Sequence, residues 1–181
     1  PDATYLLFDA GPHGGFHGHL DLFSLLLVRG RRTLLADPGR TSYDLNPARL
    51  GTLATPAHNT IHLDAFSHRP YEDGEPPLAH VTQWEPRADG SVLLSAHHTA
   101  YDHLWGRPVV RRQIFFDGDG LFVIVDRLDC AQEGAGQREH GFLVGFTLPD
   151  KDAAEIDTVR GWARTTFADG PNLFLRTLDR G

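Results

Sequence analysis

The sequence predicts an all-β protein with the architecture of an antiparallel two-sheet β-sandwich, extended and rich in hairpins. Short apolar stretches recur along the chain, and clusters of Gly, Pro and Asp separate them, as in β-sandwiches. No segment shows a sustained helical period. The length of 181 residues and the content of 40% hydrophobic and 23% charged residues suit one folded domain, which we expect to span residues 1–181.

The expected strands follow from the apolar stretches and the turns that end them. Asp37-Pro38-Gly39 ends one strand, and Ala88-Asp89-Gly90 and the segment 117–120 each join two strands in a hairpin. Roughly ten strands result. They cover residues 5–8, 20–28, 33–36, 60–63, 81–84, 92–96, 109–116, 121–125, 142–148, 159–167 and 173–178, and residues 44–55 are the best candidate for a short helix.

Charge and composition exclude several classes of function. The net charge of −7 argues against a nucleic-acid-binding surface. No apolar run reaches the roughly 20 residues that a membrane-spanning helix needs.

The chain has no Met and starts at Pro1, so we expect a piece of a longer protein. Arg111 and Arg112 suit a uronate or a sulfate, although a solvated strand face is their more ordinary place.

Histidine is the unusual feature of the composition, with 11 residues, of which His13, His17 and His19 lie close together. Residues two apart on a strand face the same side, so His17 and His19 would project together. That spacing suits two ligands of one metal ion, or one ligand beside one acid or base. The glycines around them allow a substrate to approach closely. We therefore favour a functional site over a surface loop that is merely rich in His.

Two further residues extend this candidate site. Asp37 follows an expected strand, where it is either a carboxylate ligand or part of a plain Asp-Pro-Gly turn. His58 lies just before the strand at 60–63. Together with His19 they provide two imidazoles and one carboxylate, a set that suits zinc and, less well, iron or manganese.

Three motifs resemble the ordered signature of the heparinase II/III-like polysaccharide lyases. They are His-Gly-His-Leu-Asp at 17–21, Asp-Pro-Gly at 37–39 followed by Tyr43, and Ala-His-Asn-Thr at 57–60. Arg49 lies where the family has an Arg before the third motif. The hairpin that ends in Asp-Arg-Leu at 126–128 is also similar to the family.

The resemblance implies the C-terminal β-sandwich of a lyase that also has an N-terminal α/α toroid. Such enzymes cleave uronic-acid polysaccharides (heparin, heparan sulfate or alginate) by β-elimination, which favours a periplasmic or secreted protein. The resemblance implies zinc bound by His19, Asp37 and His58. It places His17 at the active site as acid or base and Tyr43 near the substrate.

Additional residues and other functions are consistent with the sequence. We expect His13, Arg49 and Asn59 close to the substrate. The usual Tyr acid/base of the family comes from the toroid, so we expect the isolated sandwich to be inactive. The alternatives are a non-catalytic carbohydrate-binding or structural sandwich and a cupin-type metalloenzyme. A cupin needs a Glu shortly after its His-x-His motif, and no Glu follows His19 until Glu72.

Overall fold

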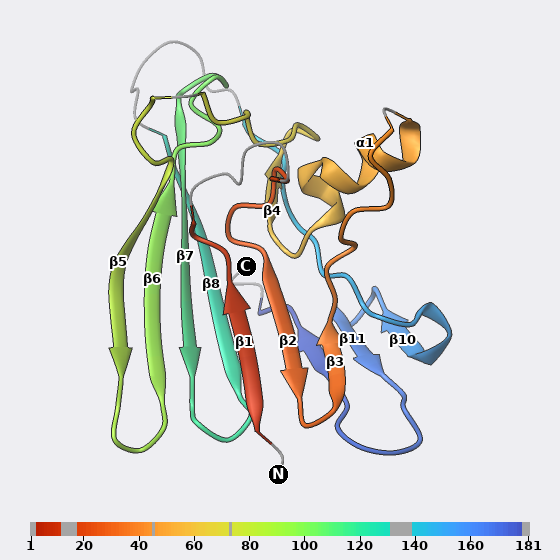
Figure 1. Cartoon of the computed structure of the whole chain (residues 1–181). Coiled ribbons are helices and arrows are strands. Elements are labelled where there is room, and N and C mark those ends of the chain that lie inside the picture. The colour runs from red at the N-terminus through yellow and green to blue at the C-terminus, as the bar shows by residue number, and fades with distance from the viewer. Residues whose placement is uncertain (1–2, 12–17, 45, 73, 131–138, 179–181) are drawn as a thin grey trace.

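The computed structural model describes residues 3–11, 18–44, 46–72, 74–130 and 139–178. Within them, strands dominate and the helices are short (Figure 1). The strands are β1 (Thr4–Phe8), β2 (Leu25–Arg29), β3 (Arg32–Leu35), β4 (Ile61–Leu63), β5 (Ala79–Pro86), β6 (Val92–His98), β7 (Pro108–Phe116), β8 (Phe122–Cys130), β9 (Phe142–Val144), β10 (Ala154–Asp157), β11 (Trp162–Thr165) and β12 (Phe174–Arg176). The helices are α1 (Pro47–Leu53) and the 3₁₀ turns η2 (Thr55–Ala57) and η3 (Lys151–Ala153).

All strand pairs are antiparallel, which confirms the predicted fold class. The strand orders are β5-β6-β7-β8, β1-β2-β3, β10-β11-β12 and β4-β9. The strands of the four-stranded sheet and of the β1-β2-β3 sheet run in similar directions (Figure 1). Their apolar faces share one core, in which Leu27 and Leu35 meet Leu94 and Ile114. This is the aligned face-to-face packing of a β-sandwich.

A second core cluster fills the end of the sandwich where β4 and α1 lie (Figure 1). Phe23, Ile61, Tyr101 and Val110 are completely buried there. Tyr101 donates its hydroxyl to the carbonyl of Ile61, so the buried polar atom is paired. This cluster fixes the chain just before β2 against β4 and the four-stranded sheet.

The inner face of β7 contains a charged residue. Val110, Arg112 and Ile114 alternate with outward residues and are all buried. The expectation of a solvated strand face therefore holds for Arg111, which is exposed, but is wrong for Arg112. Burial of Arg112 is possible because a carboxylate and two carbonyls receive its hydrogen bonds, as described below.

Several element boundaries differ from the expectation. The strand expected at 20–28 begins only at Leu25, because residues 21–24 form a turn in which Phe23 has a φ of 67°. The single strand expected at 159–167 is replaced by the β10–β11 hairpin, with Val159 in its turn. The hairpins at 88–90 and 117–120 are confirmed. In β5, the pairing with β6 shifts between Val81 and Gln83, which marks a β-bulge.

Among the described residues, no helix is both long enough and apolar enough to cross a membrane.

Candidate metal centre

Asp37 is held by the turn that follows β3. Its Oδ1 accepts a hydrogen bond of 2.8 Å from the N–H of Gly39, which lies two residues further on. Gly39 has a φ of +60°, a conformation that glycine adopts without strain. The Asp-Pro-Gly segment is therefore a plain turn and also a rigid support for the Asp37 carboxylate.

His58 follows η2, and the same segment fixes the chain next to His19. The N–H of His58 donates to the carbonyl of Thr55. The Thr55 hydroxyl donates to the carbonyl of Leu20, and the Leu20 N–H donates to the carbonyl of Leu53. Two hydrogen bonds thus hold Leu20 beside the segment that carries His58, and His19 is the residue before it.

Asn59 connects this segment to the strands that lead to Asp37. Its Nδ2 donates to the carbonyls of Leu25 and Ala36, and its Oδ1 accepts from the N–H of Thr147. The residue is completely buried. All the polar atoms of its side chain are therefore used to hold the backbone on both sides of the cluster.

The three side chains converge as the sequence predicted. One ligand atom from each of His19, Asp37 and His58 lies within 4.8 Å of the other two. His58 Nδ1 is 2.7 Å from Asp37 Oδ2, and the rings of His19 and His58 are 5.2 Å apart. His58 is buried, and its Nε2 has no hydrogen-bond partner within the part of the chain that the structure describes. The Asp37 carboxylate and the two imidazoles thus bring three donor atoms together, so the group can hold a metal ion.

The protonation states also suit metal binding. Partial burial alone would raise the pKa of Asp37, but the hydrogen bonds from His58 and from the Gly39 N–H outweigh it, and the pKa lies below its usual value. Burial and the nearby His58 lower the pKa of His19. A carboxylate and a neutral imidazole are the forms that ligate a metal.

Asp9 is a neighbour of the cluster that the sequence did not indicate. Burial raises its pKa, the Gly11 N–H acts against this, and the charges of Asp21 and Asp37 reinforce it. No motif contains Asp9, because it reaches the site only through the pairing of β1 with β2, where its N–H donates to the carbonyl of Ser24.

The remaining predicted residues lie on the segment after β3 or outside the described part. Tyr43 is 71% exposed, and the guanidinium of Arg40 lies 4.9 Å from its ring centre. Arg49 Nη1 donates to the Tyr43 carbonyl, so the half-buried Arg49 fixes the loop that presents Tyr43. His13 and His17 lie outside the described residues.

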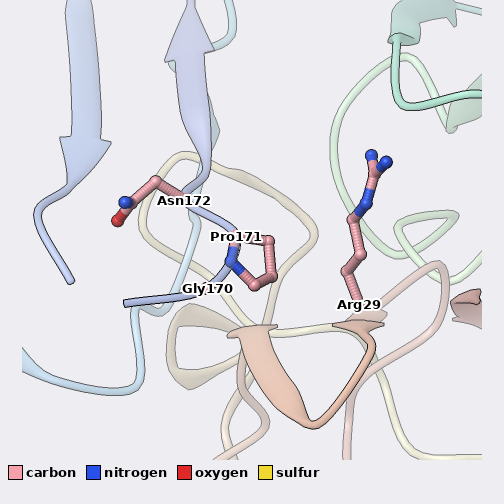
Figure 2. A pocket seen from close by; sticks show the side chains of 4 residues that line it. All are labelled: Arg29, Gly170, Pro171 and Asn172. Carbon is pink, nitrogen blue, oxygen red and sulfur yellow. The ribbon is translucent and has the colours of Figure 1, made fainter. Parts of the chain in front are cut away.

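A hollow elsewhere on the surface does not offer comparable chemistry. Arg29, Gly170, Pro171 and Asn172 line it, and the Asn172 amide points away from Arg29 (Figure 2). Asn172 is bonded to Thr165 and to the backbone of Phe167. Since Arg29 is the one charged residue in the lining, the hollow has no acid–base pair.

Fold and site together define an antiparallel β-sandwich with a His–Asp–His cluster at the end of one sheet. The family model described as "Heparinase II/III-like, C-terminal" matches residues 1–177. The chain therefore belongs to the heparinase II/III-like C-terminal family. The resemblance found in its motifs is confirmed.

Solved structures support the same fold. The heparan sulfate lyase HepC from Pedobacter heparinus superimposes with a TM-score of 0.81 at 22% identity, covering 99% of this chain and 26% of that chain. A mutant of the same lyase gives a TM-score of 0.82 at 22% identity, with the same coverage. The "Heparinase III-BT4657 gene product" gives 0.79 at 23% identity, covering 97% of this chain and 25% of that one. This chain spans about a quarter of the length of these structures. The comparison with curated proteins found no match.

Proposed function

We propose that this chain is the β-sandwich part of a polysaccharide lyase that cleaves uronic-acid glycans by β-elimination. The observation that carries the proposal is the family match over residues 1–177, together with the convergence of His19, Asp37 and His58. The structural neighbours are a heparan sulfate lyase and a heparinase III, which favours a glycosaminoglycan over alginate as substrate.

The elimination needs a base, an acid and stabilisation of negative charge. The base removes the proton at C5 of the uronate, the C5–H electrons form the C4–C5 double bond, and the C4–O bond breaks. The leaving oxygen then takes a proton. We assign His17 as base or acid, since a neutral imidazole has a pKa of about 6.5 and accepts protons near neutral pH. Tyr43 assists from its exposed loop, with Arg49 holding its carbonyl.

We propose zinc as the metal of the cluster, bound by His19, Asp37 and His58. The donor set of two imidazoles and a carboxylate fits this ion. Zinc would act as a Lewis acid or would fix the three segments in place, and we favour the second role because each ligand comes from a different segment. Asn59 is assigned a positioning role because its amide is saturated by backbone groups, and His13 is assigned to the substrate side.

The rest of the enzyme completes the site in this proposal. We propose that the natural protein carries an N-terminal α/α toroid, which supplies the remaining acid/base and closes the cleft. A polymeric substrate favours a periplasmic or secreted location. The 181 residues form a single domain in this arrangement.

The activity is tested on the full-length protein with heparan sulfate and alginate as separate substrates. Cleavage by elimination produces an unsaturated uronate, which absorbs in the ultraviolet. We expect His17→Ala to abolish this signal, while His103→Ala, an exposed residue between β6 and β7, leaves it unchanged. Glycan binding without any unsaturated product in the full-length protein would instead favour a non-catalytic binding module.

The metal is tested independently on this chain, purified without chelators. We expect about one zinc per chain, lost in His19→Ala and in Asp37→Ala. His62→Ala is the matched control, because His62 lies on β4 near the site but outside the cluster. Retention of zinc in both ligand variants would refute the assignment.

A further inference from the structure

A row of basic side chains crosses the outer face of the four-stranded sheet. The strand register pairs His80 with His97, His97 with Arg111 and Arg111 with Arg127. Each of the four strands therefore contributes one residue, and we call these four residues the basic row. With about 4.8 Å between strands, the row extends over about 14 Å.

The two arginines of the row are held by one carboxylate. Arg111 Nε and Arg127 Nε each lie 2.6 Å from an oxygen of Asp129. Their hydrogen bonds lower the pKa of Asp129, the one from Arg111 most strongly, although slight burial acts against them. Within the described residues, neither guanidinium has a hydrogen bond at its Nη atoms. Two cations share one anion, so the trio has an excess positive charge and ordered, exposed donors.

The two histidines continue the row. Their rings are stacked, with centres 5.2 Å apart and planes 30° from parallel. His97 Nδ1 has no hydrogen-bond partner in the described part of the chain. This nitrogen is buried, so the stacked pair contributes two imidazole rings at fixed positions next to Arg111 and not that atom.

A row of uncharged polar groups lies beside the basic row on the same face. Gln113 Nε2 donates to Ser95 Oγ, which donates to Gln83 Oε1, at 3.1 and 3.0 Å. The side chains are thus locked across three strands. Neither row contains Phe, Tyr or Trp. The exposed Trp84 pairs with Leu94, whose side chain is buried in the core on the other face.

We propose that this outer face is a second binding site, which takes a short stretch of an acidic polysaccharide along the basic row. Carboxylate or sulfate groups would contact Arg111 and Arg127, and the Gln83–Ser95–Gln113 ladder would contact hydroxyl groups. The choice of an acidic polysaccharide as ligand rests on the proposed function. The choice of the binding residues does not, because none of them belongs to the proposed lyase site. A nucleic acid is the weaker alternative, since single-stranded binders stack bases on aromatic side chains and this chain has a net charge of −7.

The test is calorimetric titration of the 181-residue chain with a heparan sulfate hexasaccharide at low salt. In Arg111→Gln/Arg127→Gln, we expect the affinity to fall by about tenfold or more, as for the loss of charge-assisted hydrogen bonds. Arg160→Gln/Arg164→Gln removes the same charge from two exposed arginines on the β10–β11 hairpin, and we expect a change of less than about twofold.

The location is tested by NMR of the histidine rings during the same titration. We expect the signals of His80 and His97 to shift and those of the buried His68 to remain in place. Equal losses of affinity in the two double variants, unchanged His80 and His97 signals, or equally tight binding of a DNA strand of the same charge would each overturn the proposal. These results are independent of cleavage, so failure here and failure of the lyase proposal are distinguishable.

Discussion

Arg112 on β7 forms a bidentate ion pair with Asp126 on β8, with Nε–Oδ1 and Nη2–Oδ2 distances of 2.7 and 2.8 Å. The Arg112 Nη1 also donates to the carbonyls of Phe23 and Asn59. These two residues belong to the segments that precede β2 and β4. The buried guanidinium therefore connects the four-stranded sheet to the loops that position the His–Asp–His cluster.

We predict that Arg112→Met lowers the free energy of unfolding by about 3–5 kcal/mol, because Asp126 is left buried without its partner. Urea unfolding followed by tryptophan fluorescence measures this change. The matched control is Arg111→Met on the exposed face of the same strand, where we expect a loss of no more than about 1 kcal/mol. In Arg112→Met/Asp126→Leu, part of the loss should be recovered, and a simple sum of the single effects would contradict the coupling.

Two buried histidines predict an acid-sensitive stability. Burial lowers the pKa of His68 to about 3 and that of His98 well below its usual value, and their rings lie 4.8 Å apart. Below pH 6.5 these two histidines become protonated in the unfolded chain but stay neutral in the folded chain. The free energy of unfolding therefore keeps its full value above this pH. It falls toward pH 3 by about 1.4 kcal/mol per pH unit for each residue.

The variant His98→Asn isolates one of these residues, because the Asn Oδ1 can accept the Ala100 N–H bond that His98 Nδ1 accepts. We expect the slope of unfolding free energy against pH, measured from pH 7 to pH 4, to decrease by about one proton. An unaltered slope in His98→Asn would show that this imidazole is protonated in the folded state.

Asn59→Ala should weaken both the fold and the metal site. The substitution leaves the carbonyls of Leu25 and Ala36 and the N–H of Thr147 without their partner, at a cost of about 3 kcal/mol or more. The affinity for the proposed zinc ion should fall with it, because Ala36 and Asn59 adjoin the proposed ligands Asp37 and His58. Asn172→Ala also removes an amide with three hydrogen bonds, but at an exposed turn, and should leave zinc affinity unchanged.

One substitution at two glycines should have opposite effects. Gly39→Ala forces a side chain into a φ of +60° and should destabilise the fold by about 1 kcal/mol, although space is open around it. Gly51→Ala lies inside α1, also with open space, and should stabilise by about 0.5–1 kcal/mol. Thermal unfolding of both variants measures the two effects. Equal changes in the midpoint temperature would contradict the strain at Gly39.

The fold class and the convergence of the His–Asp–His cluster were accessible from sequence for physical reasons. The hairpins at 88–90 and 117–120 have local turn chemistry, and alternation marks the strands around them. His19, Asp37 and His58 stand in short motifs, so their convergence was predicted. The helix at Pro47–Leu53 was also placed within the candidate segment 44–55.

The residues that sequence reasoning missed depend on long-range pairing. Arg112 looks like a surface residue until Asp126 and the carbonyls of Phe23 and Asn59 surround it. Asp9 approaches the cluster only through the β1–β2 register. The turn at Phe23 delays the start of the expected strand to Leu25, because a buried aromatic contact outweighs the local apolar run.

The bulge between Val81 and Gln83 has a consequence for solubility. Among the described strands, β5 lies at the end of its sheet and leaves backbone donors and acceptors open along one side. A straight, regular edge of this kind invites a second chain to add a strand, which is a route to aggregation. The extra residue at the bulge breaks the regular spacing and bends the edge, next to the exposed side chains of Val81 and Trp84. The irregularity in β5 thus protects its edge against pairing with another molecule.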